Sequence, residues 1–497
     1  MNILLIYPRG RTLRFGVALG MVSLGTILKE KGHNVKLVDL RYYPKGDYLH
    51  NVLKRKWDII GFFSTTEVAK EVVELKRKVA KQCPDSKFIV GGVHTVIDPN
   101  FFLDDFDFIV IGEAENTVVE LAEFIEKGRE DYSKVKGIMF KKGNKVVKTP
   151  RREFLDLNKL PLPDYGLYPN IKEIMQQDLL WTNIHHFANV MITRGCPFDC
   201  TFCQPTLRSM FGIKVRRLSP ERVYELLSML KDKYKIKEVY FGDDLLLNKG
   251  LRDWSYGVFD AVNKLGLRFS ASSRVNTADY DLLKKAKECG CHTLLAGVES
   301  GSPKVLKFYN KMITPDDIRL FFKNCKKLGI MVLSQIIYGA PVETKEDADM
   351  TYNLMKEIKP DMVWSNILTP YPGTHLYTYL CKHKVDFVKD INKMDRGRHS
   401  KKIYSQLPEE ELFKYEMKSI PISPSMINMI TRRYYRKIYF EKLWSLIRNK
   451  EFKSFSKFVL FTLTEPIANK VRIYTYKYPD NIIIKRLTRL RAKLTSA

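Results

Sequence analysis

Residues 194–203 read RGCPFDCTFC and place Cys196, Cys200 and Cys203 within one short loop. The loop follows NVMITRG (189–195), an apolar segment that predicts a core strand. Three thiolates can bind three irons of a 4Fe-4S cluster and leave the fourth iron open to another ligand. An open coordination position indicates chemistry rather than a purely structural metal. Two alternatives stand beside this interpretation, namely a zinc knot completed by Cys289 or Cys291 and three unrelated buried thiols.

Predicted strands and helices alternate after the cysteine loop. The strand segments are EVYFGDD (238–244), RFSASSRV (268–275), TLLAGVES (293–300), MVLSQIIYGAP (331–341) and MVWSNILTPYP (362–372). Helical segments separate them, so six or seven β/α units follow one another in order. This pattern predicts a full or partial barrel over residues 186–395.

A second strand and helix alternation occupies residues 1–130. Its strand segments are NILLIYP (2–8), HNVKLVDL (33–40), DIIGFFS (58–64), KFIVGG (87–92) and FDFIVIG (106–112). Continuous apolar runs indicate strands covered on both faces, and the pattern predicts a doubly wound parallel sheet whose ligands bind off the carboxyl ends of the strands. No Gly-x-Gly-x-x-Gly follows the first strand, which argues against a dinucleotide.

The two α/β regions are joined by a predicted connector, and a third region follows them. Residues 131–185 contain a hairpin-like segment (137–150) and Leu-Pro-Leu-Pro (160–163), both typical of a connector. Residues 396–497 read as a mainly helical, aromatic and basic C-terminal region. The predicted fold class is therefore α/β, with a parallel-sheet front domain, a partial (β/α)6 barrel and a basic helical end.

Composition narrows the functional classes. The net charge is +28, and residues 401–497 carry 21 Lys and Arg against 8 Asp and Glu, which favours anionic partners such as phosphate backbones, lipid head groups or an acidic protein. A solvated, lysine-rich surface is the alternative. Eight cysteines are too few for a disulfide scaffold in 497 residues. We expect a cytoplasmic protein, because the first residues resemble a core strand rather than a signal peptide and no apolar run is long enough to span a bilayer.

With these motifs in order, residues 186–395 resemble the radical SAM superfamily, whose signature is this three-cysteine loop with an aromatic residue, here Phe202, before the last cysteine. The resemblance implies that SAM chelates the open iron and is cleaved to a 5'-deoxyadenosyl radical. It also implies a set of SAM-binding residues: Gly242, Asp243 and Asp244 for the methionine amino group, and Ser272, Arg274, Glu299 and Lys311 for the ribose and the carboxylate. The segment 338–344 resembles Gly-x-Pro-Gly-Glu-Thr, with Val342 in place of the usual Gly.

Residues 1–130 resemble the cobalamin-binding domain that precedes many radical SAM barrels. The resemblance implies cobalamin as a further cofactor, with a site built from Ser64, Thr65, Gly91, Gly92, His94, Gly112 and Glu113. Glycine lets a backbone approach a corrin or its nucleotide tail closely. The Asp-x-His-x-x-Gly of other cobalamin proteins is missing, as is usual for the radical SAM subclass. His94 and Glu113 as ordinary polar residues at the sheet end are the alternative.

The resemblance implies methylation of an unactivated carbon or phosphorus. Ring closure or C–C bond formation, as in the anaerobic magnesium-protoporphyrin ester cyclase, is the alternative, together with a non-catalytic corrin or iron-sulfur carrier. Transfer RNA modification is disfavoured, and no nucleic-acid partner is expected, because only Cys83 precedes Cys196 and a second three-cysteine site is absent from the sequence.

The expected partners are a small-molecule or lipid-like substrate and reduced flavodoxin or ferredoxin as electron donor. Basic and aromatic residues interleave in 434–440 and 452–463, which favours peripheral association with an anionic membrane at its inner face. A helix that packs its aromatic face on the barrel explains the same pattern.

Overall fold

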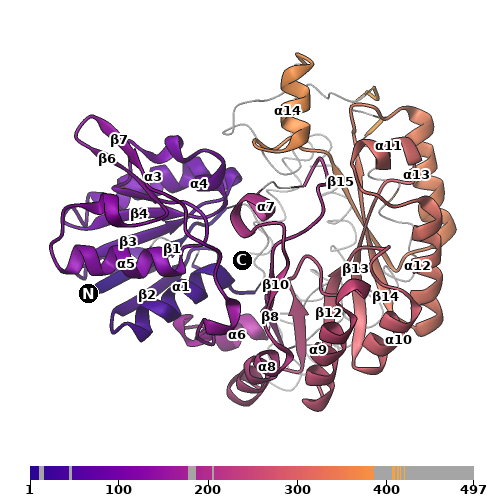
Figure 1. The fold of residues 1–497 in the computed structure, drawn as a ribbon, viewed down its shortest axis with the longest axis horizontal. Coiled ribbons are helices and arrows are strands. Elements are labelled where there is room, and N and C mark those ends of the chain that lie inside the picture. The colour runs from indigo at the N-terminus through magenta and orange to yellow at the C-terminus, as the bar shows by residue number, and fades with distance from the viewer. Residues whose placement is uncertain are drawn as a thin grey trace, which may run out of the picture. The chain divides into compact units, whose positions relative to one another are not determined.

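The computed structural model describes residues 1–10, 16–43, 47–176, 186–203 and 206–385, with a few positions between 406 and 419 (Figure 1). The first sheet has the strand order β2-β1-β3-β4-β5-β6-β7. Its parallel strands are β1 (Asn2–Tyr7), β2 (Asn34–Asp39), β3 (Ile59–Phe63), β4 (Lys87–Gly91) and β5 (Phe108–Val110). Helices α1 (Leu19–Glu30), α2 (Asp47–Leu53), α3 (Ala69–Ala80) and α4 (Val93–Ile97) connect them, and α5 (Glu115–Glu126) follows β5. The doubly wound front domain predicted from the sequence is confirmed.

Both faces of this sheet are buried, which explains the continuous apolar runs of its strands. Successive side chains of a strand point to opposite faces. Ile3 and Leu5 of β1 pack in one cluster with residues of α1 and α5. Leu4 and Ile6 pack on the other face with residues of α2 and α3. The loops at the carboxyl ends of the strands therefore remain the expected ligand site.

The predicted connector contributes to the front sheet. Strands β6 (Ile138–Lys142) and β7 (Lys145–Lys148) form the hairpin and pair antiparallel onto β5. The connector is also fixed by two buried tyrosines: the Tyr165 hydroxyl donates to the Asn189 carbonyl over 2.7 Å, and the Tyr168 hydroxyl donates to Asp39 over 2.8 Å. The connector is thus tied to the front domain through β6 and Tyr168 and to the barrel through Tyr165.

The second sheet is a partial barrel with the order β15-β14-β13-β12-β11-β8, all parallel. Its strands are β8 (Phe187–Val190), β11 (Glu238–Phe241), β12 (Arg268–Ser273), β13 (Cys291–Glu299), β14 (Met331–Tyr338) and β15 (Met362–Ile367). Helices alternate with them: α8 (Pro220–Tyr234), α9 (Arg252–Lys264), α10 (Tyr280–Glu288), α12 (Pro315–Leu328) and α13 (Lys345–Ile358). The strands β8 and β15 end the sheet and are not paired with each other, so the sheet is open.

Local sequence signals set the starts of the barrel helices. Thr314 with Asp317, and Thr344 with Asp347, form capping boxes at α12 and α13, which satisfy backbone N–H groups at both helix starts. Asp347 also accepts a hydrogen bond from Ser302 over 2.6 Å, which ties α13 to the loop after β13. Among the helices of the described residues, none combines the length and the apolar character needed to cross a bilayer.

Candidate active site

The cysteine loop, defined as residues 195–203, connects β9 (Thr193–Arg194) to α7 (Thr206–Phe211) after β8 of the barrel sheet. Three backbone hydrogen bonds anchor it to separate elements: Cys196 N–H to Gly212 O at 3.3 Å, Thr201 N–H to Tyr309 O at 2.9 Å, and Leu376 N–H to Thr201 O at 2.9 Å. Gly195 has φ +101°, and a Cβ there would lie 2.5 Å from the Lys214 carbonyl oxygen. The loop is therefore held in one conformation.

The three thiols of this loop are free and half-buried. Burial raises the pKa of Cys196, and burial with the neighbouring Cys200 and Asp244 raises the pKa of Cys203 to about 12. Such thiols keep their protons until a cation displaces them. No three His, Cys, Asp or Glu side chains of the described residues converge as one metal ion requires. A 4Fe-4S cluster takes each thiolate on a different iron, which three cysteines within eight residues can provide.

The zinc-knot alternative requires Cys289 or Cys291 as a fourth ligand. Cys291 is the first residue of β13 and Cys289 lies just before it at the end of α10, whereas the cysteine loop follows the end of β8. Because the barrel strands are parallel, these positions lie at opposite edges of the sheet. Cys289 Sγ instead lies 3.8 Å from Asp260 Oδ1. The geometry therefore disfavours this alternative.

The turn after β11 places two carboxyl groups beside the cysteine loop. Asp243 Oδ1 accepts hydrogen bonds from the Ile192 N–H at 2.9 Å and from the Thr193 hydroxyl at 2.6 Å, while Asp243 Oδ2 is buried and has no hydrogen-bond partner among the described residues. Burial raises the pKa of Asp243 to about 7 and the pKa of Asp244 to about 6. Buried carboxyl groups in this state can accept an ammonium group, as the resemblance predicts for SAM.

Arg274, at the end of β12, connects the SAM motifs with the cysteine loop. Its guanidinium lies 3.9 Å from the centre of the Phe198 ring, and its Nη1 lies 3.6 Å from Cys200 Sγ. Nε donates to Asn276 over 3.0 Å. Nη2 is buried and has no partner among the described residues. A buried guanidinium with an unused donor is suited to bind a carboxylate.

Glu299 and Lys311 form a buried ion pair with Nζ and Oε1 2.6 Å apart. Glu299 has φ +63°, an uncommon conformation for a residue other than glycine, and uncommon conformations gather at functional sites. A Cβ at Gly297 would lie 2.6 Å from Glu299 Oε1 and 2.8 Å from Lys311 Nζ, so Gly297 makes room for the pair. The structure thus brings these two predicted SAM residues together, whereas Ser272 lies half-buried on β12.

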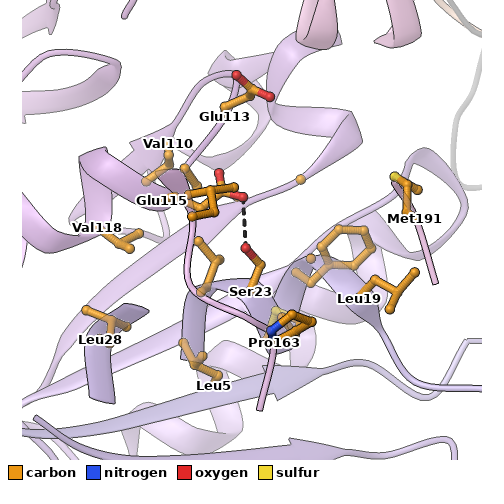
Figure 2. Close-up of a pocket in the computed structure, with 18 of the residues that line it drawn as sticks. Leu5, Leu19, Ser23, Leu28, Val110, Glu113, Glu115, Val118, Pro163 and Met191 are labelled. Atoms are coloured by element: carbon orange, nitrogen blue, oxygen red, sulfur yellow. Dashed lines mark hydrogen bonds between the residues drawn. The ribbon is translucent and has the colours of Figure 1, made fainter. Parts of the chain in front are cut away.

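A cavity of about 370 Å³ lies over one face of the front sheet and reaches the carboxyl ends of β4 and β5 (Figure 2). It is mainly apolar and is lined by residues of the front sheet, α1, the Leu157–Pro163 part of the connector, and the barrel. Four of the predicted cobalamin-site residues line it: Gly91, Gly92, Gly112 and Glu113. Ser64, Thr65 and His94 do not.

Glu113 does not present a free carboxylate to this cavity. Its Oε1 accepts from Arg194 at 2.8 Å and from Arg216 at 2.9 Å, and its Oε2 accepts from the Leu155 N–H at 2.9 Å. Glu115 pairs with Arg194 over 2.5 Å. Burial acts to raise the pKa of Glu115, but pairing with Arg194 outweighs it and leaves that pKa below its ordinary value.

The roles of Glu115, Arg194 and Arg216 were missed by the sequence analysis. The sequence shows only two acidic residues after one predicted strand and arginines beside the cysteine loop, and nothing in this pattern indicates that they meet.

His94 belongs to the core. Its side chain is fully buried, with ring centroids 5.3 Å from Phe101 and 5.6 Å from Phe102, and Nδ1 lies 3.3 Å from the Thr66 hydroxyl. Burial lowers the pKa of His94 to about 4, so the ring is neutral at neutral pH. The environment favours the alternative in which His94 is an ordinary residue of the sheet end.

A three-cysteine loop at the carboxyl edge of a parallel partial barrel, with a doubly wound domain before it, defines a class of radical SAM enzymes. Residues 190–355 match the model of the radical SAM superfamily, and residues 14–122 match that of the B12 binding domain. The chain is 34% identical over 392 residues to an uncharacterized methyltransferase, PH0819, of Pyrococcus horikoshii, an alignment that covers 76% of this chain and 83% of that protein.

Two further proteins extend the likeness. The anaerobic magnesium-protoporphyrin IX monomethyl ester cyclase of Rubrivivax gelatinosus is 28% identical, over 69% of this chain and 63% of that protein. The structure of the methyltransferase TsrM from Kitasatospora setae, with cobalamin and a 4Fe-4S cluster bound, has a TM-score of 0.64 at 15% identity, over 84% of this chain and 81% of that one. The second likeness concerns the fold alone.

The chain belongs to the radical SAM superfamily, in the group that carries a B12-binding domain, and it is an enzyme. The radical SAM domain implies a 4Fe-4S cluster and SAM as cofactors, and the B12-binding domain implies cobalamin.

The buried, neutral His94 predicts a pH-dependent stability. The unfolded chain binds a proton at the ordinary pKa of 6.5, whereas the folded chain binds it only near 4. The stability that depends on a neutral His94 is therefore fully present above pH 6.5 and is lost as the pH falls from 6.5 toward 4. Between pH 8 and 5.5 the lost free energy of unfolding is about 1.4 kcal/mol. In H94Q, urea unfolding at both pH values should show a correspondingly weaker pH dependence. An unchanged dependence would place His94 outside the core.

Proposed function

We propose that the chain is a cobalamin-dependent radical SAM methyltransferase that acts on an unactivated carbon of a small molecule. One observation carries the proposal. Arg194 lines the cavity of the front domain and also stands two residues before Cys196. A corrinoid bound in the front domain would therefore lie next to the cysteine loop, as transfer of a methyl group to a substrate radical requires.

The residues of the barrel fit the cofactors of this class. Cys196, Cys200 and Cys203 would hold the cluster, Asp243 and Asp244 the methionine amino group, and Arg274 the methionine carboxylate. Glu299 and Lys311, which form an ion pair with each other, would contact the ribose and the carboxylate of SAM. When bound, the cluster supplies the electron that cleaves SAM, and cobalamin supplies the methyl group.

The chain itself positions these groups and excludes water. Phe198 stacks on Arg274 and holds its guanidinium beside Cys200. The buried carboxyl groups of Asp243 and Asp244 lie in surroundings where an ammonium partner is attracted more strongly than in water. The apolar lining of the cavity removes water from the front-domain side of the site.

The cavity is suited to one end of a corrinoid. Its volume of about 370 Å³ lies at the low end of the range for small-molecule sites, and its lining is mainly apolar. A flat aromatic base would fill such a space, with the backbone at Gly91, Gly92 and Gly112 next to it.

Ring closure or C–C bond formation is the second candidate function. It is supported by the identity to the magnesium-protoporphyrin ester cyclase. Both functions use the same cofactors, so the products of SAM distinguish them. Modification of RNA has less support, because Cys83, the single cysteine before Cys196, is buried with Sγ 3.7 Å from the Leu53 carbonyl oxygen.

Methylation predicts two products from SAM. Full-length enzyme, reconstituted anaerobically with iron, sulfide and hydroxocobalamin and then reduced with titanium citrate, should release S-adenosylhomocysteine in proportion to bound cobalamin, together with 5'-deoxyadenosine. Liquid chromatography with mass spectrometry quantifies both. C200S should lose deoxyadenosine, whereas C381S, at an exposed cysteine of α14 (His375–Lys382), should keep it. Deoxyadenosine without S-adenosylhomocysteine, in enzyme that holds cobalamin, contradicts methylation and favours ring closure.

The lipid-like substrate and the membrane association are a narrower proposal. The segments 434–440 and 452–463 that motivate them lie outside the described residues. The proposal predicts co-sedimentation of the full-length protein with anionic phosphatidylglycerol vesicles at low salt, with release at high salt, since the attraction is electrostatic. Neutral phosphatidylcholine vesicles are the control. Equal binding to both vesicles, or to neither, would contradict it.

A further inference from the structure

Four mostly buried charged side chains connect the front domain to the start of the cysteine loop. We define the carboxylate–arginine network as Glu113, Glu115, Arg194 and Arg216. The exposed fraction of each carboxylate side chain is at most 5%, and those of the two arginines are 14% and 16%. The network contains two positive and two negative groups. Such a buried set is stable only while each charge keeps its partners.

The two arginines need the carboxylates of the front domain. Arg194 of β9 and Arg216 of β10 (Arg216–Arg217) stand directly opposite each other in an antiparallel pair. Like charges at opposite positions repel and destabilise the pairing. Glu113 accepts hydrogen bonds from both arginines, and Glu115 accepts a second one from Arg194. The β9–β10 pair therefore depends on two residues from another domain.

One end of the network lies in the wall of the front-domain cavity. Glu113, Glu115 and Arg194 all line the cavity. The Ser23 hydroxyl, from α1, donates to Glu115 over 3.0 Å, and Figure 2 shows this hydrogen bond beside the cavity. A molecule that fills the cavity would touch the carboxylates or the elements that hold them.

The other end of the network fixes the start of the cysteine loop. Arg194 is followed by Gly195, which packs against the Lys214 carbonyl oxygen, and by Cys196, whose N–H donates to Gly212 O. Arg216 also donates to the Phe211 carbonyl at the end of α7, over 3.0 Å. A shift of Arg194 or Arg216 would thus move the first cysteine and the segment that closes the loop.

We propose that the carboxylate–arginine network couples the two cofactor sites, so that a corrinoid in the front domain and a cluster in the cysteine loop each strengthen binding of the other. Glu113, Glu115, Arg194 and Arg216 are positioning residues in this proposal, which rests on the proposed function. Coupling between two sites is reciprocal, and typical values change affinity by about 5-fold to 150-fold.

The test measures the affinity for hydroxocobalamin in two forms of the full-length protein. One form carries the reconstituted cluster, and the other carries C196A, C200A and C203A and holds no cluster. Corrin absorbance gives the dissociation constant of each. We expect the cluster to tighten binding at least about 5-fold. The measured ratio is the dissociation constant of the cluster-free form divided by that of the form with the cluster. In R194M this ratio should fall close to one, because the link between cavity and loop is removed, while cobalamin still binds.

Two further variants separate coupling from folding. E115Q removes one of the two carboxylates and keeps Glu113 with both arginines, so its ratio should lie between those of the wild type and R194M. E120Q removes a carboxylate from the same helix, α5, that pairs with Arg152 and does not contact the loop, so its ratio should equal that of the wild type. Circular dichroism identifies a variant that fails to fold, and E115Q then decides the question.

A ratio of one in the wild type, with hydroxocobalamin bound, overturns the coupling and leaves the proposed function intact. An undiminished ratio in folded R194M or E115Q also overturns it. If hydroxocobalamin binds neither the protein with the reconstituted cluster nor the triple-alanine variant, the proposed function and the coupling both fail.

Discussion

The carboxylate–arginine network is the interaction on which the arrangement of the site depends. Arg194 and Arg216 face each other across a two-stranded pairing and would repel without Glu113 and Glu115. Glu113 follows β5 and Glu115 begins α5 of the front domain, so the segment that begins the cysteine loop depends on residues of another domain. The same residues line the front-domain cavity. Removing one partner would leave a buried charge uncompensated, which in comparable cases costs about 3–5 kcal/mol.

The candidate functional residues of both domains lie at the carboxyl ends of parallel strands. In the barrel, the segments after β8, β11 and β12 carry the cysteines, Asp243 with Asp244, and Arg274, and Glu299 is the last residue of β13. In the front domain, the turns after β4 and β5 carry the glycines and Glu113. The carboxyl ends of parallel strands all lie at one edge of a sheet, so this topology alone brings residues far apart in the chain close together. Tyr371, for instance, donates to Glu67 over 2.6 Å across 304 positions.

The sequence was sufficient to predict what depends on local patterns. Apolar strand segments that alternate with helical segments predicted both sheets, and the spacing of Cys196, Cys200 and Cys203 predicted the loop. Features that depend on distant partners were not predictable. The hairpin 138–148 was assigned to a connector, because nothing local shows that it pairs with β5. The sequence left open whether His94 and Glu113 belong to a cobalamin site or are ordinary polar residues, because the aromatic rings beside His94 and the arginine beside Glu113 come near only on folding.

The central claim is that the three thiolates hold a reducible cluster with one iron open to SAM. The most direct measurement is the electron paramagnetic resonance spectrum of the anaerobically reconstituted, reduced protein, recorded with and without SAM. The account predicts a cluster signal whose shape changes when SAM is added, because SAM binds the open iron. The absence of a cluster signal, or identical spectra with and without SAM, would contradict it.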